Sequence, residues 1–132
     1  MFVAASLASR ANRGTSIGVL RRGDCFNLSK GLFGEKADRV RCAAPHTDEV
    51  AGVLPFPADR PAGYPGRDGI LEVGKRECPP LAREFFGEKP FSDADTFVFG
   101  PDQAAWEKGE RAVVCSLRSP SAAKRTGSYL GG

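Results

Sequence analysis

The spacing of apolar residues predicts short strands toward both ends of the chain. Over residues 48–56, apolar residues alternate with small or polar ones, and Val50, Gly52 and Leu54 fall on one side, which is typical of a half-buried strand. Further stretches with strand character are 16–20, 39–42, 96–100 and 111–117, with 126–130 as a candidate final edge strand. The pattern therefore predicts a sheet built from short strands.

In the middle of the chain the apolar period changes to three and four residues, which is the period of one helix face. This face comprises Ile70, Leu71, Gly74, Cys78, Leu81, Ala82 and Phe85. Pro79 and Pro80 interrupt it, and because a proline inside a helix removes a hydrogen bond, we expect a break or kink there. The second piece is expected over 80–86, and residues 101–109 predict a short second helix. The expected fold is α+β, with a small antiparallel sheet, one kinked helix and a short second helix.

Composition places the chain among globular domains. Its 132 residues are 41% hydrophobic and 27% charged, and the net charge of +3 comes from basic and acidic residues that are interspersed. Such a mixed surface lacks the basic stripe of a nucleic-acid-binding protein. Residues 1–18 are expected to form an N-terminal arm, whose apolar start is too short to span a bilayer and is either a plain arm or the remnant of a membrane anchor. Residues 19–131 form the expected domain.

Four cysteines, Cys25, Cys42, Cys78 and Cys115, favour two disulfides in an oxidising compartment, because an even count in a small Gly- and Pro-rich chain indicates such a framework. Three pairings are open to four cysteines. A faint internal echo relates GEKADRVRCAAP (34–45) to GERAVVCSLRSP (109–120), each preceded by one further cysteine. As two parallel half-units, the echo pairs Cys25 with Cys42 and Cys78 with Cys115, although so short a match also arises by chance.

Several short motifs follow one another in a recognisable order. They are GDCFNL, VRCAAPHTDEV, YPG, a helical cysteine, FVFGPDQAAWEKGERAVVC and a closing TGSYLGG. This series resembles the septum formation domain family of actinobacterial envelope proteins over about residues 19–131. The resemblance implies an extracytoplasmic domain, commonly behind a membrane anchor, with a link to the division septum or envelope and no established enzyme activity. It also supports the pairing of Cys25 with Cys42 and of Cys78 with Cys115.

Cys42 and His46, followed by Asp48 and Glu49, raise the question of a reactive site. A metal site needs four converging ligands, and close cysteine pairs, which commonly supply them, are missing from this sequence. To act as a nucleophile, Cys42 needs a free thiolate and an oriented base. We favour a structural role, in which Cys42 closes a disulfide and His46 fixes a turn by bonding Asp48, Glu49 or a backbone carbonyl. No catalytic residue, metal or cofactor is therefore predicted.

Two further residues are candidates for binding. Trp106 is expected to pack over the sheet near Cys115 and to cover the second disulfide, or else to stand exposed as the anchor of an interface. Arg111 is expected to brace an acid such as Asp95 or Glu107.

The tripeptide 22–24 is Arg-Gly-Asp, which integrins read in some extracellular proteins, but a turn into the first cysteine explains it equally well. The sequence predicts a non-catalytic envelope domain that binds envelope or membrane proteins or cell-wall components. Neither a nucleic acid nor a small-molecule substrate is expected as a partner. The alternatives are an accessory subunit of a membrane protein complex and, less favoured, a Cys/His metal-binding or thiol-dependent enzyme module.

Overall fold

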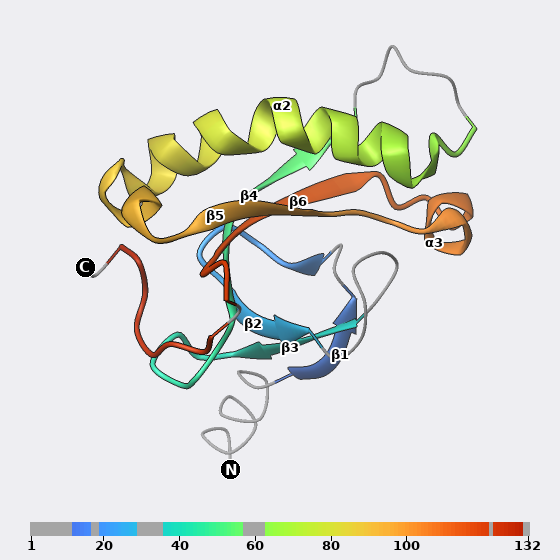
Figure 1. Ribbon diagram of the computed structural model, residues 1–132. Helices are drawn as coiled ribbons and strands as arrows, with labels where there is room; N and C mark the ends of the chain where they lie inside the picture. The colour runs from blue at the N-terminus through green and yellow to red at the C-terminus, as the bar shows by residue number, and fades with distance from the viewer. Residues whose placement is uncertain (1–11, 17–18, 29–35, 57–62, 122, 131–132) are drawn as a thin grey trace.

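The computed structural model of the chain describes residues 12–16, 19–28, 36–56, 63–121 and 123–130 (Figure 1). In chain order the elements are β1 (Asn12–Ser16), β2 (Cys25–Leu28), β3 (Lys36–Val40), β4 (Asp48–Pro55), α2 (Gly66–Phe86), the 3-10 turn η2 (Lys89–Ser92), β5 (Asp95–Phe99), α3 (Gln103–Glu107) and β6 (Ala112–Arg118). This is the predicted α+β fold, with an antiparallel sheet, one long helix, one short helix and two disulfides.

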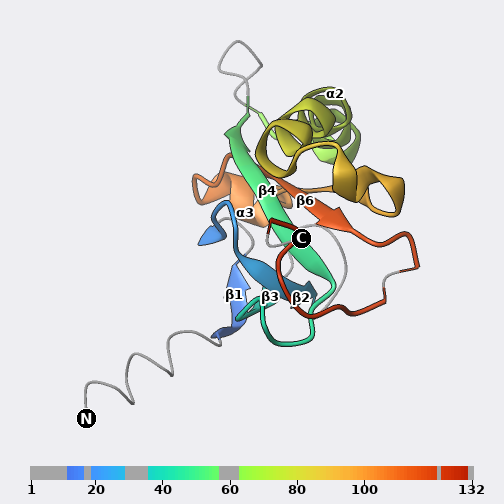
Figure 2. The same ribbon diagram turned by 90° about the vertical axis from the view of Figure 1, so that its left-hand side faces the viewer.

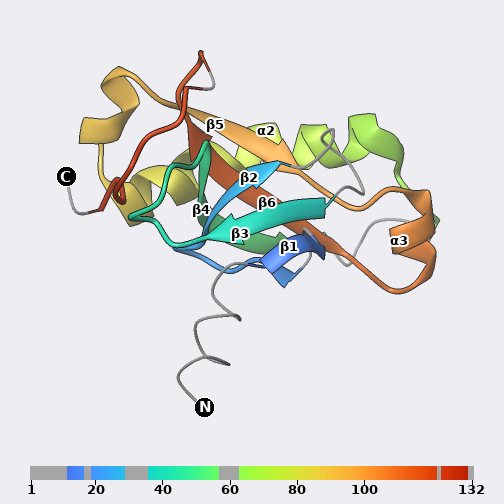
Figure 3. The same ribbon diagram turned by 90° about the horizontal axis from the view of Figure 1, so that it is seen from below.

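The strands form one antiparallel sheet in the order β1-β3-β2-β4-β6-β5. β4 and β6 pair along their whole lengths, from Asp48 opposite Arg118 to Pro55 opposite Ala112. β2 pairs with β4 at only two positions, Cys25 with Glu49 and Phe26 with Asp48. The sheet can therefore turn sharply between these two strands, and Figure 3 shows β2 and β3 crossing in front of β6 when the molecule is seen from below.

Two layers of apolar side chains hold the sheet in this shape. On one face, α2 covers β4, β5 and β6. The end-on view of Figure 2 shows the helix over β4 and β6. The clusters under the helix are Ala51, Cys78, Ala82, Phe86, Ala94, Cys115 and Leu117, and Phe56, Ile70, Val73, Trp106 and Val113. On the other face, β2 and β3 fold against β5 and β6 around Leu20, Phe26, Ala37, Val50, Phe99 and Val114. The core is thus shared between a helix–sheet layer and a sheet–sheet layer.

The long helix α2 runs without interruption through Pro79 and Pro80, so the predicted division into two pieces is wrong. The two prolines cannot donate to the carbonyls four residues earlier, on Lys75 and Arg76, but these residues are exposed and water can reach their carbonyls. Buried residues on both sides of the prolines pin the helix to the sheet. The helix ends at Phe86, as predicted, and the next residue, Gly87, has a φ of 79° that suits glycine.

Two glycines allow the helix and sheet to approach closely. A Cβ on Gly74 of α2 would lie 2.3 Å from Cγ1 of Val98, and a Cβ on Gly52 of β4 would lie 2.5 Å from Cδ2 of Leu81. Distances below 3 Å are not tolerated without movement, so a larger residue at Gly74 would push the helix away from β5.

A β-bulge in β4 changes which side chains face the helix. The register with β6 shifts between Val50 and Gly52. Val50 therefore packs in the sheet–sheet layer, whereas Ala51 packs under α2 and Gly52 contacts Leu81 there. The prediction that Val50, Gly52 and Leu54 share one side is wrong for Val50, because the extra residue of a bulge breaks the two-residue alternation.

Strands 48–56, 96–100 and 111–117 were predicted within one residue of their observed bounds, and 39–42 overlaps β3. Of the predicted strand 16–20, Ser16 ends β1, residues 17–18 lie outside the described ranges, and Val19 and Leu20 are not in a strand. The predicted edge strand 126–130 is also absent, since hydrogen bonds to side chains replace a ladder there. β2 was not predicted.

Part of the N-terminal arm predicted over 1–18 falls within the description. Residues 12–16 form β1 and pair with β3 at the edge of the sheet, and the apolar residues 1–9 lie outside the described ranges. Among the described residues, no helix combines the length and apolar character that crossing a bilayer requires.

Candidate functional site

His46 lies in the connection between β3 and β4 and is fully buried. Its Nδ1 lies 2.8 Å from the carbonyl oxygen of Ala44, so Nδ1 carries a proton and donates it there. Its backbone N–H and carbonyl exchange 2.9 Å hydrogen bonds with Arg125 near the C-terminus. The prediction that His46 fixes a turn by bonding a backbone carbonyl is confirmed. The side chain of His46 is held by this bond and not by Asp48 or Glu49. Within the described part of the chain, Nε2 has no hydrogen-bond partner.

Asp48 is the centre of a buried polar cluster on β4. One of its oxygens accepts a 2.7 Å hydrogen bond from Ser116 Oγ, and the other accepts 2.6 Å from Thr47 Oγ1. Arg118 donates to both oxygens from Nε, at 3.0 and 3.1 Å, and again from Nη2 at 3.0 Å. The Arg118 guanidinium also lies 4.4 Å from the ring centroid of Phe97. The carboxylate is therefore fully paired and serves to join β4 to β6.

Glu49, the next residue, points away from this cluster because side chains alternate along a strand. It is buried as well, and it accepts hydrogen bonds from Ser128 Oγ and from the backbone N–H of Tyr129, the latter at 2.8 Å. Gly127, with φ of 91°, donates its N–H to the carbonyl of Cys42 at 2.6 Å. Residues 125–129, hereafter the C-terminal clasp, are thus tied to the segment 42–49 at three points.

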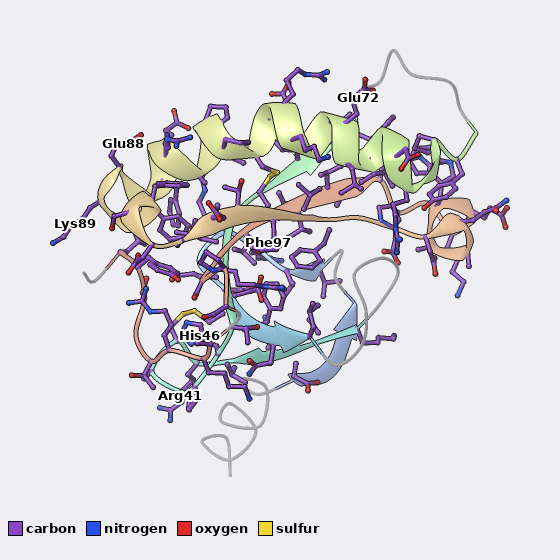
Figure 4. All side chains as sticks on the ribbon, in the orientation of Figure 1. Arg41, His46, Glu72, Glu88, Lys89 and Phe97 are labelled. Atoms are coloured by element: carbon purple, nitrogen blue, oxygen red, sulfur yellow. A yellow bond between two sulfur atoms is a disulfide. The ribbon has the colours of Figure 1, made fainter. Side chains whose placement is uncertain are left out.

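The cysteines pair as Cys25–Cys42 and Cys78–Cys115, which confirms the predicted connectivity. The sulfurs of Cys25 and Cys42 and a carboxylate oxygen of Glu49 all lie within 4.8 Å of one another, a spacing that suits metal ligands. The two sulfurs are bonded to each other, however, and a disulfide offers no thiolate to a metal ion or to a substrate. In this form the segment 39–50 is a scaffold. Figure 4 shows His46 at the same end of the molecule as this disulfide.

Trp106 is only 5% exposed, so it belongs to the core, and the reading of it as an exposed anchor is wrong. Its predicted place over the second disulfide is wrong too. Trp106 packs with Phe56, Ile70, Val73 and Val113, whereas Cys78 and Cys115 lie in the neighbouring cluster. The reason is that α3 begins beyond the end of β5, so its tryptophan reaches the part of β6 nearest the N-terminal half of α2.

Arg111 is exposed and stacks on the ring of Trp106, with the guanidinium carbon 3.7 Å from the ring centroid. Its Nη1 donates to the carbonyl oxygens of Trp106 and Glu110. No ion pair with Asp95 or Glu107 occurs in the described structure, so the predicted brace to an acid is replaced by a cation–π contact.

A pocket of about 370 Å³ opens beside this stack and is lined by Gly63, Tyr64, Gln103, Trp106, Glu107 and Arg111. The hydroxyl of Tyr64 donates to the carbonyl of Pro101 at 2.9 Å. Burial raises the pKa of that hydroxyl above its usual value, and the charge of Asp102 raises it further, while Arg67 lowers it. Of the three candidate binding residues, Trp106 and Arg111 therefore share one pocket, and His46 lies elsewhere, inside the protein.

The structure has a second, larger pocket of about 690 Å³, which the sequence analysis did not predict. It lies between the segment before β2, strand β4 and helix α2, and its lining residues are Val19, Leu20, Arg21, Arg22, Gly52, Val53 and Leu81. Val19 and Val53 are two of the exposed large apolar residues of the described chain. Arg22 donates to the carbonyl of Ala51 at 2.9 Å and lies 4.6 Å from the ring centroid of Phe85.

The tripeptide 22–24 forms the predicted turn. Gly23 has φ of 91° and donates to the Val50 carbonyl at 2.8 Å, and Asp24 Oδ2 accepts from the N–H of Arg21 at 2.9 Å. Local backbone geometry therefore accounts for its glycine and its aspartate.

Fold and site together define a small α+β domain that is cross-linked by two disulfides and whose reactive residue types are built into the scaffold. Residues 22–130 match the family described as Septum formation, so the chain belongs to this family. Two proteins of Mycobacterium tuberculosis, the "Uncharacterized membrane protein" MT3943 of strain CDC 1551 and Rv3835 of strain H37Rv, are each 32% identical to it over 107 residues, which is 74% of this chain. The match covers 24% of each relative's length. No solved structure matches the chain.

Proposed function

We propose that this chain is a non-catalytic, extracytoplasmic domain of the cell envelope that binds other proteins or cell-wall components where the septum forms. The proposal rests on one observation: the side chains that the sequence offered as a reactive site are bonded within the fold. All four cysteines are in disulfides, and His46, Asp48 and Glu49 are buried and bonded to the scaffold. A nucleophile or general base needs access to a substrate, and these groups are committed to holding the fold.

Two observations support the extracytoplasmic location. Disulfides form and persist in oxidising compartments, and this domain has two of them, one in its core. Membership of the Septum formation family links the chain to division, and the relatives from Mycobacterium tuberculosis are named membrane proteins. We infer that the domain works at the outer side of the membrane.

A second reading of the same data is an accessory subunit of a membrane protein complex. It is favoured by the names of the relatives and by the fact that the match covers about a quarter of their length. The two readings differ in the partner that the domain contacts, either mobile envelope material or a fixed membrane subunit.

Photo-cross-linking in dividing host cells tests the proposal. A photoreactive amino acid is placed in the full-length protein at Gln103, which lines the pocket beside Trp106, or at Val53, which lines the larger pocket. The matched control is Lys75, exposed on the outer face of α2. We expect cross-links to envelope proteins or cell-wall material from Gln103 or Val53 but not from Lys75. A repeated cross-link to one membrane protein in fixed stoichiometry favours the subunit reading, and cross-links from neither pocket overturn the proposal.

A further inference from the structure

The two disulfides differ in their access to solvent. Cys78 and Cys115 are both 0% exposed, and their bond lies in the core between α2 and the sheet. Cys25 is 1% exposed, but Cys42 is only half-buried, and both residues line a pocket of about 430 Å³ at the surface. A reagent can therefore reach the first disulfide from outside the folded protein, whereas the second becomes accessible only when the helix leaves the sheet.

The charges around this pocket are mixed, with an exposed cation at the rim. Arg39 and Arg41 line the pocket together with Asp24, and Arg39 lies 3.9 Å from the Asp24 carboxylate. Glu49 lies on the inner side, where Ser128 and the N–H of Tyr129 donate to its oxygens. Arg41 is exposed and forms no ion pair among the described residues, so its charge faces incoming molecules. Figure 4 places it at the surface at this end of the molecule.

We propose that Cys42 is a site of thiol–disulfide exchange at which an anionic thiol from solution opens the Cys25–Cys42 bond in the folded protein. This modification site does not depend on the proposed binding function. A disulfide with one sulfur within reach of solvent exchanges more readily than a buried one, because attack requires a thiolate and access to that sulfur, and a nearby cation attracts an anionic thiolate. Cys42 is the sulfur attacked, since Cys25 is almost fully covered.

The exchange proceeds in two balanced steps. The incoming thiolate forms a bond to Cys42 Sγ while the bond to Cys25 Sγ breaks, and Cys25 leaves as a thiolate that takes a proton from water. Cys42 then carries a mixed disulfide with the external thiol. A second thiolate attacks the external sulfur of this mixed disulfide, so Cys42 is released as a thiolate and the two external thiols are oxidised to their own disulfide.

The surroundings of Cys42 can accept this change. Its Sγ lies 3.5 Å from the carbonyl oxygen of Gly23, and a Cys42 thiol can donate to that oxygen once the disulfide is open. Its own carbonyl accepts from Gly127 of the C-terminal clasp. Opening the bond therefore removes one covalent tie between β2 and the segment that anchors the clasp.

Reduction of the native full-length protein tests the proposal with three small thiols. They are 2-mercaptoethanesulfonate, which is anionic, 2-mercaptoethanol, which is neutral, and cysteamine, which is cationic, and each rate is expressed per concentration of thiolate. Samples are quenched and alkylated, and the modified cysteines are located by peptide mass spectrometry. We expect Cys25 and Cys42 to react at least about tenfold faster than Cys78 and Cys115, because the buried pair reacts only after opening of the core. The mixed disulfide should be found on Cys42.

The charge of Arg41 is tested in the same assay. Arg41→Ala should lower the rate of reduction by the anionic thiol about two- to fivefold and leave the rate with the neutral thiol nearly unchanged. The matched control is Arg76→Ala, which removes an exposed arginine on α2 and should change neither rate. Equal reduction rates for the two disulfides, an adduct on Cys25, or a cationic thiol that reacts fastest with the wild-type protein would each overturn the proposal.

Discussion

The buried ion pair of Asp48 and Arg118 is expected to be one of the largest single contributions of a polar group to stability. Asp48 is 0% exposed, and the side chain of Arg118 is 12% exposed. In Asp48→Ala, Ser116 loses its acceptor and the arginine keeps a charge that has little water around it. Removal of one partner from a buried pair costs about 3–5 kcal/mol, and we expect the lower half of this range because Arg118 retains some solvent and its contact with the ring of Phe97.

The measurement is urea unfolding of the purified domain, completed as a double-mutant cycle with Arg118→Met, which keeps most of the packing of the arginine stem. The cycle should give a coupling energy of roughly 1–3 kcal/mol. Asp95→Asn is the matched control, because Asp95 lies opposite Arg118 in the β5–β6 register but is exposed. It should change stability by less than about 0.5 kcal/mol. If Asp48→Ala costs no more than this control, or if the two single effects simply add, the pair does not hold β4 to β6.

Three further substitutions test other parts of the account. His46→Ala should lower the free energy of unfolding in urea by about 2–4 kcal/mol, because it empties a buried volume and removes the bond to Ala44. Unchanged stability would contradict the structural role. Trp106→Ala should cost about 3–5 kcal/mol, and wild-type Trp106 should be shielded from iodide quenching; ready quenching would place it at the surface. Ser128→Ala should cost about 1–2 kcal/mol by releasing the clasp from Glu49, with exposed Ser121→Ala as the neutral control; equal effects would show that the clasp adds nothing.

The strands and helix that are set by local pattern could be predicted from the sequence. β4 and β6 show alternation or a β-branched run, so their existence and bounds followed from spacing. The period of α2 predicted a helix and its end, but neither its start at Gly66 nor its continuity. A break or kink at Pro79 and Pro80 was expected from local rules. The helix is not broken there, since packing of buried residues on both sides outweighs the lost hydrogen bonds. β2 was not predicted, because its four residues are too few to show an alternation of apolar and polar positions.

The cysteine pairing was predicted correctly, but the internal echo does not reflect a structural repeat. Cys42 lies beyond the end of β3 and pairs with the start of β2, whereas Cys115 lies inside β6 and pairs with a helix. The two halves therefore share a connectivity and not a conformation. The family resemblance gave independent support for the pairing.

The partners in the polar cluster could not be predicted, because they are distant along the chain. Ser128 lies 79 residues from Glu49, and Arg118 lies 70 residues from Asp48. What the sequence could indicate is that two adjacent acids in an apolar strand point to opposite faces and need separate partners. Residues 126–130, which overlap the clasp, were predicted as an edge strand. Their hydrogen bonds instead go to the buried side chain of Glu49 on β4 and to the carbonyl of Cys42, which are also distant along the chain.

We propose that this domain brings its protein to the site of septum formation by binding and not by catalysis. The most direct test follows the full-length protein in dividing host cells by an epitope tag on its extracytoplasmic side, with and without residues 22–130. The account predicts enrichment at the septum for the intact protein and an even distribution over the envelope once those residues are removed. Septal enrichment that survives the deletion, or its absence from the intact protein, would contradict it.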